Sequence, residues 1–372
     1  MFYKTILNIG TYIYLYLKMR YTVAEYIWLD ADKKFRSKTK VIKCEKIVLH
    51  SEYKYPHDFP VWDYDGSSTG QTDGKKSEIM LHPVFVCDNP LSPAVLIDGR
   101  YKNKICSSKL VLCETYHADG TPTKSNTRHN ANKISKHTHN QKPWFGLEQE
   151  YFIFDKRIET TPHNLLFYET TEHYCGTGED IEYRALAEEH MLACTSADIT
   201  ISGINAEVSK NQWEFQIGPS EGIEAADELL VARFLLERIA EKYGNTISYE
   251  PKPFSHINGS GCHANFSTFK MRTPCDDNAG IMEIYRVVNN LEKYHAEDIQ
   301  HYGIRNESRL SGKYETSSYN TFTSGIGDRG ASVRINNNTH NAGYGYFEDR
   351  RPAANMDPYL VTSILMKRTI DA

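Results

Sequence analysis

The sequence lacks the signatures of several common protein classes. No C-x-x-C pair occurs among its eight cysteines, so a zinc ribbon or a redox dithiol is not expected. No G-x-x-x-x-G-K-[ST] loop is present, which excludes a P-loop ATPase, and no protein-kinase catalytic-loop motif is present. The net charge of −5 does not favour nucleic acid as a partner.

Long hydrophobic runs are also lacking. The apolar run at residues 12–17 is too short to span a bilayer, and no small-residue cleavage site follows it. We therefore expect no membrane partner, and we expect residues 1–22 to form an extension packed on the fold or on a neighbouring subunit. The cysteines fit the reduced, mostly buried thiols of a cytoplasmic protein.

A length of 372 residues predicts two domains. After the extension, residues 23–120 form a β-rich first domain and residues 121–372 a second domain. The polar segment 117–128 contains the boundary. The first domain has expected strands at 25–31, 35–42 and 110–116, a loop at 62–77 and an inserted surface excursion at 88–108.

The second domain alternates strands and helices. Its clearest helix is Glu224–Tyr243, where apolar residues recur at helical spacing and Gly244 follows as a C-terminal stop. Other helices are expected at 180–195, 279–302 and 357–370, the last with Asp357 as N-cap and Pro358 at its first position.

The expected strands of the second domain alternate polar and apolar residues, which predicts antiparallel strands with one face packed on a core. Each polar face alone fits an ordinary solvated surface. Together they contain Glu, His, Asn and Arg but no Lys, which favours a sheet whose polar face lines a cavity. These faces are Asn205 and Glu207; Gln212, Glu214 and Gln216; His263, Asn265 and Ser267; and Ser332, Arg334 and Asn336.

Glu148 and Glu150 stand two residues apart in an apolar and aromatic run, Trp144–Tyr151. On a strand, both carboxylates leave the same face. Neighbouring acids repel unless a cation compensates, and hard oxygen ligands suit Mg²⁺ or Mn²⁺. The pair alone fits a solvated strand edge equally well, and Gln149 falls on the opposite face.

Arginines crowd the last quarter of the chain, and five of them form the candidate set. Guanidinium groups bind carboxylates and phosphates through forked hydrogen bonds. Together with the acids they indicate an anionic substrate bridged by metal ions, as in phosphoryl transfer. Surface ion pairs are the alternative, above all where Arg350 and Arg351 follow Glu348 and Asp349. The five are Arg309, Arg329, Arg334, Arg350 and Arg351.

Several ordered stretches of the chain together resemble glutamine synthetase of the eukaryotic type (class II). The matching stretches are Trp62–Thr69, Trp144–Tyr151, Asn205–Val208, Gln212–Pro219, Asn258–Ser267, Arg309–Ser317, Arg329–Ile335 and Tyr346–Asp357. The resemblance implies an α+β fold, with an N-terminal β-grasp domain and a catalytic domain whose curved antiparallel sheet is flanked by helices.

The resemblance also implies an activity and an assembly. The reaction is the ATP-dependent condensation of L-glutamate with ammonium to L-glutamine, through γ-glutamyl phosphate, in nitrogen assimilation. Two or three Mg²⁺ or Mn²⁺ ions per site are implied as cofactors. Enzymes of this class form homo-oligomeric rings, usually a decamer of two pentameric rings, with active sites between adjacent subunits.

Site residues follow from the resemblance position by position. One metal ion is expected at Glu150, Glu207 and Glu214, and another at Glu148, His263 and Glu348. ATP contacts are expected from Glu148, Glu214, Asn265, Ser267, Arg329, Arg334, Tyr346 and Phe347, and glutamate contacts from Gly259, Arg309, Arg329 and Arg350. The catalytic set is Asp65, which binds ammonium from a neighbouring subunit and takes its proton, Glu315 on a flap over the intermediate, and Arg329.

Two positions depart from the family pattern. Tyr314 stands where the family commonly has His, and His256-Ile257 stands where Asn-Trp is usual. Two alternatives to a glutamine synthetase follow, namely a γ-glutamyl ligase for a larger amine and an inactive structural homologue. All six expected metal ligands are present with Glu315, which argues against the inactive homologue, and the Asp-Gly-Ser-Ser-Thr setting of Asp65 favours ammonia.

Overall fold

The computed structural model describes residues 20–44, 55–92, 105–156, 173–179, 181–274 and 278–370. The chain divides into two compact units, Met1–Asn126 with Ser196–Asp198, and Thr127–Thr195 with Ile199–Ala372. The expected extension lies outside the described residues as far as residue 19, and so do residues 93–104 of the expected surface excursion. The domain limits at 23–120 and 121–372 stay a prediction.

The first unit is built on a mixed five-stranded sheet in the order β2-β1-β5-β4-β3. β1 and β5 pair in parallel at its centre, and the other neighbours are antiparallel. Ala24, Tyr26 and Trp28 alternate along β1 and enter the core of this unit. The strands are β1 Arg20–Leu29, β2 Phe35–Cys44, β3 Trp62–Asp65, β4 Glu78–Asp88 and β5 Ile105–His117.

The loop predicted at 62–77 is wrong in its first part. Trp62–Asp65 forms β3, and the 3₁₀ turn η2 follows at Gly66–Thr69. Tyr64 pairs with Ile79 of β4, and its ring packs on Trp28 at 4.5 Å between centroids. The Gly-Ser-Ser-Thr run concealed this short strand, because its turn composition dominates the window.

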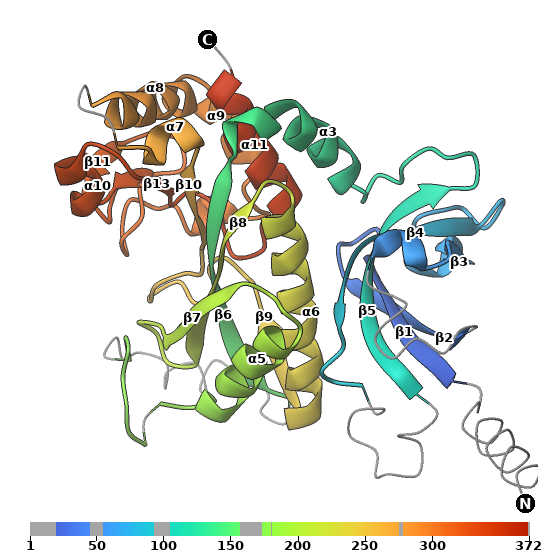
Figure 1. Cartoon of the computed structure of the whole chain (residues 1–372). Helices are drawn as coiled ribbons and strands as arrows, with labels where there is room; N and C mark the ends of the chain where they lie inside the picture. Colours follow the sequence, from blue (N-terminus) through green and yellow to red (C-terminus); the bar gives the residue numbers. More distant parts are fainter. Residues whose placement is uncertain are drawn as a thin grey trace, which may run out of the picture. The chain divides into compact units, whose positions relative to one another are not determined.

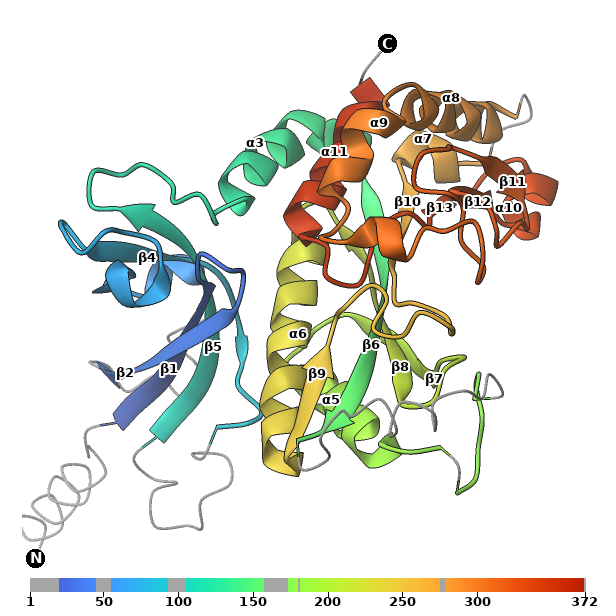
Figure 2. The same cartoon turned by 180° about the vertical axis from the view of Figure 1, so that it is seen from behind.

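The second unit contains a larger sheet in the order β11-β12-β13-β10-β6-β8-β7, with β9 also paired to β6. Neighbours are antiparallel except β11 and β12, so the antiparallel prediction is wrong at that edge. Figures 1 and 2 show the sheet curving beside helix α6. The strands are β6 Trp144–Asp155, β7 Ile201–Ala206, β8 Gln212–Glu221, β9 Asn245–Ser248, β10 Cys262–Ser267, β11 Ser324–Ile326, β12 Val333–Ile335 and β13 Phe347–Asp349.

Helices cover this sheet, and α6 packs on β6, β8 and β9. The predicted helix at Glu224–Tyr243 is confirmed, and Gly244 ends it with a left-handed φ of 71°. The α-helices are α3 Arg128–Thr138, α5 Arg184–Ser196, α6 Glu224–Tyr243, α7 Phe269–Arg272, α8 Ala279–Lys293, α9 His295–Asp298, α10 Asn337–Ala342 and α11 Pro358–Ile370. The 3₁₀ helices are η1 Pro56–Asp58, η2 Gly66–Thr69, η3 His139–Gln141, η5 Ile299–His301 and η6 Asn306–Ser308.

Two sequence expectations need correction here, and one helix was missed. The helix expected at 279–302 is interrupted, because α8 stops before Tyr294 and shorter turns follow. Helix α3 was not predicted, since its sequence is polar throughout and only Ala131 and Thr138 are buried. β7 ends at Ala206, so Glu207 lies in the turn to β8 and does not share a strand with Asn205.

Among the described residues, no helix combines the length and the apolar character that crossing a membrane requires.

Candidate active site

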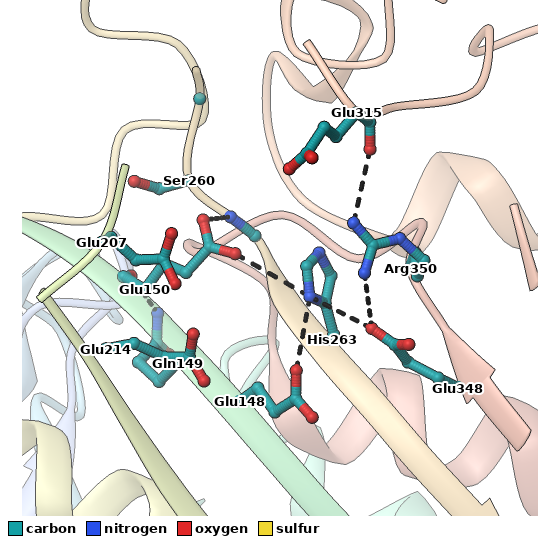
Figure 3. Close-up of polar contacts among 12 residues, drawn as sticks. Glu148, Gln149, Glu150, Glu207, Glu214, Ser260, His263, Glu315, Glu348 and Arg350 are labelled. Carbon is teal, nitrogen blue, oxygen red and sulfur yellow. Dashed lines mark hydrogen bonds and ion pairs between the residues drawn. The ribbon is translucent and has the colours of Figure 1, made fainter. Parts of the chain in front are cut away.

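Strand register brings the acidic side chains of the second unit onto one face of the sheet. Glu148 of β6 pairs with His263 of β10, and Glu150 of β6 pairs with Glu214 of β8. Glu348 of β13 pairs with Asn265 on the other edge of β10. Because neighbouring positions across a sheet lie on the same face, these residues converge, as Figure 3 shows.

A compact ligand set forms around His263. Its Nδ1 lies 3.6 Å from Glu148 Oε2, 3.8 Å from Glu150 Oε1 and 3.4 Å from Glu348 Oε1. One ligand atom each from Glu148, His263 and Glu348 lies within 4.8 Å of the others. Burial, and then the Arg350 guanidinium, lower the pKa of His263 well below its usual range. The imidazole is therefore neutral, which is its metal-binding form.

A second group of acids lies beside the first. Burial and the charge of Glu214 raise the pKa of Glu150 to about 8 against the Arg309 charge. Burial and the charge of Glu150 raise the pKa of Glu207 to about 7, while burial and the contact with Glu207 raise the pKa of Glu214 to about 9. Too little positive charge lies near these three carboxyl groups for all of them to ionise together near neutral pH.

Hydrogen bonds hold the second group in place. Glu150 Oε2 accepts from the Gly261 amide at 2.9 Å, and Glu207 Oε2 accepts from the Val208 amide at 3.0 Å. Gln216 Nε2 donates to Glu214 Oε1 at 2.5 Å. Buried carboxylates that face each other and are fixed by amides fit divalent cations, because an ion supplies the charge that they lack and hard oxygen is its preferred ligand.

Gln149, between the two acids of β6, faces the opposite side of the sheet and is fully buried. Its Oε1 accepts from Arg233 Nε of α6 at 2.7 Å, and its Nε2 donates to the Ala354 carbonyl at 3.1 Å. The polar residue that disturbed the alternation therefore anchors the sheet to α6.

Arginines dominate the β13 end of the same face. Glu348 accepts from Arg334 Nε, and Arg350 Nη1 donates to its Oε1 at 2.7 Å. Arg309 Nη2 donates to His263 Nε2 at 2.9 Å. Burial lowers the pKa of Arg309 to about 10 against the charge of Glu150, so it stays charged at neutral pH. The β13 end therefore has more guanidinium groups than are required to neutralise the Glu348 carboxylate.

The other residues expected to bind glutamate or to act in catalysis lie around this end or in the first unit. The Glu315 carbonyl accepts from Arg350 Nη2 at 3.4 Å, while the Glu315 carboxylate belongs to an exposed residue (Figure 3). Arg329 is exposed, and its carbonyl accepts from Arg350 Nε at 3.1 Å. A Cβ at Gly259 would lie 2.3 Å from the Pro251 carbonyl oxygen, so only glycine fits there.

Asp65 lies in the first unit, where it caps η2. It accepts from the Ser67 and Ser68 hydroxyls, each at 2.7 Å. These hydrogen bonds lower the pKa of Asp65 to about 2, so this exposed carboxylate is charged at any ordinary pH.

A pocket of ≈ 430 Å³ in the second unit shares Glu148 with the acidic cluster. Of the residues expected to contact ATP, Glu148, Asn265, Ser267 and Tyr346 line it. The Phe347 ring instead packs on Phe266 in the core. The sequence reasoning missed further lining residues, namely Trp144, Ser202, Gly218, Pro219 and Arg272.

Two of these missed residues form one wall of the pocket. The Arg272 guanidinium lies 3.9 Å from the centre of the Trp144 ring. Arg272 Nη1 also donates to the Ser267 carbonyl at 3.2 Å. Trp144 begins the run that contains Glu148. Its side chain is 40% exposed, so this large aromatic ring is not packed in the core.

Comparisons with known proteins show the family of this chain. The family model described as "Glutamine synthetase, catalytic domain" matches residues 124–371. Glutamine synthetase of Debaryomyces hansenii is 44% identical over 349 residues, which cover 93% of this chain and 88% of the relative. Glutamine synthetase cytosolic isozyme 2 of Glycine max is 43% identical over 356 residues, 94% of each chain.

A solved structure supports the fold. The cryo-EM structure of Plasmodium falciparum glutamine synthetase aligns with a TM-score of 0.71 at 18% identity, covering 93% of this chain and 71% of the other. The helix-flanked curved sheet with its N-terminal strands is therefore the expected fold. By family model and by close relatives over nearly its whole length, this chain belongs to the glutamine synthetase family.

Proposed function

We propose that this chain condenses L-glutamate with ammonia to give L-glutamine, driven by ATP and passing through γ-glutamyl phosphate. The chain is then a glutamate–ammonia ligase. The observation that carries the proposal is the position of Glu148, which belongs both to the acidic cluster around His263 and to the wall of the ≈ 430 Å³ pocket. A nucleotide in that pocket would thus present its phosphates to the cluster.

Six residues would hold divalent cations, Mg²⁺ or Mn²⁺. Glu150, Glu207 and Glu214 form one ligand set, and Glu148, His263 and Glu348 form the other. Bound ions would neutralise charge on the phosphates during transfer. The raised pKa values of the first set support this role, because buried acids that repel each other bind a cation in exchange for protons.

ATP would occupy the pocket with its base near Trp144 and Tyr346. Asn265 and Ser267 line the same pocket and offer an amide and a hydroxyl. Arg272 stacks on Trp144, which keeps a flat aromatic surface oriented for a base. Arg334 and Arg329 would bind phosphate oxygens at the β13 end, where a guanidinium fork suits them.

Glutamate would bind at the β13 end of the polar face, among the arginines. Arg309 is buried and charged, and Arg350 is held between Glu348 and the Glu315 carbonyl. Both are fixed before a ligand arrives, so their forks need little reordering to bind a carboxylate. Gly259 packs closely against Arg309, whose Cγ lies 3.1 Å from an ideal Cβ at 259, so a side chain at this position would press on the arginine.

Ammonium would bind at Asp65, supplied by a neighbouring subunit. A pKa of about 2 gives an anion that attracts ammonium strongly but is a weak base on an exposed loop. Transfer of the proton requires a drier setting, which a site between subunits provides. We therefore propose a homo-oligomer, a decamer of two pentameric rings, located in the cytoplasm, with Glu315 on a flap that excludes water from the acyl phosphate.

The experiment is a complete assay of the purified protein with ATP, L-glutamate, ammonium and Mg²⁺. We expect equal amounts of glutamine and phosphate, and no product when any component is left out. A parallel series with methylamine and ethylamine tests the γ-glutamyl-amine ligase, which the relatives do not favour. Metal-loaded, assembled protein that forms no glutamine would overturn the proposal.

A matched variant tests the flap. Glu315→Ala should lower turnover by about 10²-fold or more, the typical contribution of a positioned acid or base. Light scattering should show unchanged assembly, because Glu315 is an exposed residue.

A further inference from the structure

The flap segment 312–317 is closed on itself by short-range hydrogen bonds. The Gly312 amide donates to the Ser317 carbonyl at 3.2 Å, and Thr316 Oγ1 donates to the Lys313 carbonyl at 2.8 Å. Within this loop, Tyr314 and Glu315 have φ values of 56° and 59°. Side chains other than glycine rarely adopt this left-handed conformation, so contacts outside the loop are needed to hold it.

One such contact joins the flap to the segment between β9 and β10. Lys252 Nζ lies 3.9 Å from the centre of the Tyr314 ring, within the range of a cation–π interaction. The same ammonium donates to the Ile257 carbonyl. Lys252 therefore connects Tyr314 and Ile257, two positions at which the sequence departs from the family pattern.

The Lys252 side chain is held along its length. Its Cδ lies 3.4 Å from an ideal Cβ at Gly259, so the stem crosses the backbone of that glycine. The Ser260 amide donates to the Pro251 carbonyl at 2.9 Å and closes the segment that carries Lys252. A lysine whose stem and head are both fixed loses less rotamer freedom when it contacts the flap.

From these contacts we infer that Lys252 and Tyr314 form a latch. The latch holds the flap over the β13 end of the site, where glutamate is proposed to bind, and positions Glu315. The inference rests on the proposed function. Lys252 and Tyr314 are positioning residues, because they act through the backbone that carries Glu315. The latch favours the closed flap and so protects the acyl phosphate from water, which would otherwise attack the phosphoryl-activated carbonyl and release glutamate and phosphate.

The test compares Lys252→Met, Tyr314→Leu and their double variant with Tyr314→Phe. Met keeps the length of the stem without the charge, Leu removes the aromatic face, and Phe keeps it. A cation–π contact of this kind should shift flap opening by about 2-fold to 30-fold. The Lys242→Met and Tyr243→Leu variants are matched controls, because Lys242 Nζ lies 5.6 Å from the Tyr243 ring at the surface of α6.

Two measurements separate a latch from general loss of stability. The first is the ratio of phosphate released to glutamine formed, which should rise above equality in Lys252→Met and Tyr314→Leu and stay at equality in Tyr314→Phe and both controls. The second is amide hydrogen exchange in the peptide 311–318, which should become faster by the same factor in Lys252→Met, whose flap sequence is unchanged.

The double variant should be no more affected than the stronger single variant, because either substitution alone removes the contact. Additive effects, or unchanged exchange in Lys252→Met, would overturn the latch. A wild-type protein that forms no glutamine would instead defeat the proposed function, while hydrogen exchange would still test the latch alone.

Discussion

The two ends of the polar face in the second unit hold their acids in opposite ways. At the β8 end, Glu150, Glu207 and Glu214 face one another, and burial with mutual repulsion raises the pKa of each. At the β13 end, Glu348 is paired with Arg334 and Arg350. The first end has excess negative charge and the second has excess positive charge.

The difference shows how one sheet can bind two kinds of partner. Cations suit the first end, because an ion relieves the repulsion among its acids. Anionic groups suit the second end, because Arg334 and Arg350 share the single carboxylate of Glu348 and the buried Arg309 donates to no carboxylate among the described residues. Glu148 and His263 lie between them, so a phosphate placed there would contact both kinds of charge.

The two faces of β13 give a second contrast. Glu348 and Arg350 face the site, while Asp349 and Arg351 face the core and are fully buried. Asp349 Oδ1 and Oδ2 accept from Arg351 Nε and Nη2 at 2.9 Å and 2.7 Å. The interpretation of this acidic and basic run as surface ion pairs is therefore wrong, since both faces are buried.

The largest effect should come from Glu348→Ala. Removing this carboxylate leaves Arg334 and Arg350 without their partner in a buried setting, which should lower the free energy of unfolding by about 3–5 kcal/mol. Urea denaturation of the purified protein measures it. Glu189→Ala, which breaks an exposed pair with Lys242, is the control and should cost under about 1 kcal/mol. Equal losses of unfolding free energy in the two variants would show that the Glu348 pairs stabilise the fold no more than an exposed ion pair does.

Unlike Glu348→Ala, Glu214→Gln should not lower the free energy of unfolding of the metal-free protein. Glutamine cannot ionise beside the other acids, so at a pH at which Glu214 would ionise, the EDTA-treated variant should be at least as stable as the EDTA-treated wild type. Affinity for Mn²⁺ should fall by about 100-fold or more, or about 2.7 kcal/mol, since one ligand is lost. Calorimetric titration with Mn²⁺ measures the loss, and an unchanged affinity would contradict the ligand assignment.

The raised pKa values at the β8 end also predict that the stability of the folded protein depends on pH. The pKa values of Glu150, Glu207 and Glu214 are raised from 4.5 to about 8, 7 and 9, so the folded chain keeps protons that the unfolded chain releases. Stability of EDTA-treated protein is then full below about pH 4.5 and falls as pH rises toward 9, by about 1.4 kcal/mol per pH unit for each such proton.

Divalent cation should reverse this trend. The ion replaces the protons, so Mg²⁺ should stabilise the protein more at pH 8.5 than at pH 6, as measured by thermal unfolding across the two conditions. Stabilisation by Mg²⁺ that does not depend on pH would show that these acids do not exchange protons for the ion.

The smallest of these effects should come from Arg350→Lys. The Arg350 guanidinium donates to Glu348, to the Arg329 carbonyl and to the Glu315 carbonyl, and an ammonium cannot reproduce that fork. The KM for glutamate should rise by about 10-fold, with a smaller change in the KM for ATP. Steady-state kinetics measures both, and equal changes would place Arg350 outside the glutamate site.

Much of the fold and the site could be predicted from the sequence. Apolar spacing and Gly244 located α6 at its observed limits, and two-residue alternation located β8 and β10. The roles of individual site residues came from a resemblance to a family, and they remain proposals. Short elements such as β3 and β13 are fixed by pairing with other strands, so their own sequences give little signal.

Which side chains are available, and which of them share a strand face, follows from the sequence alone, because alternation along a strand is a local property. The tertiary structure decided which faces meet. Register across β10, β6 and β8 places Glu148 beside His263 and Glu150 beside Glu214, although Glu148 and His263 are far apart along the chain. It also decided that Gln149 binds Arg233 in the core and that Lys252 lies over Tyr314, since such contacts depend on packing between distant segments.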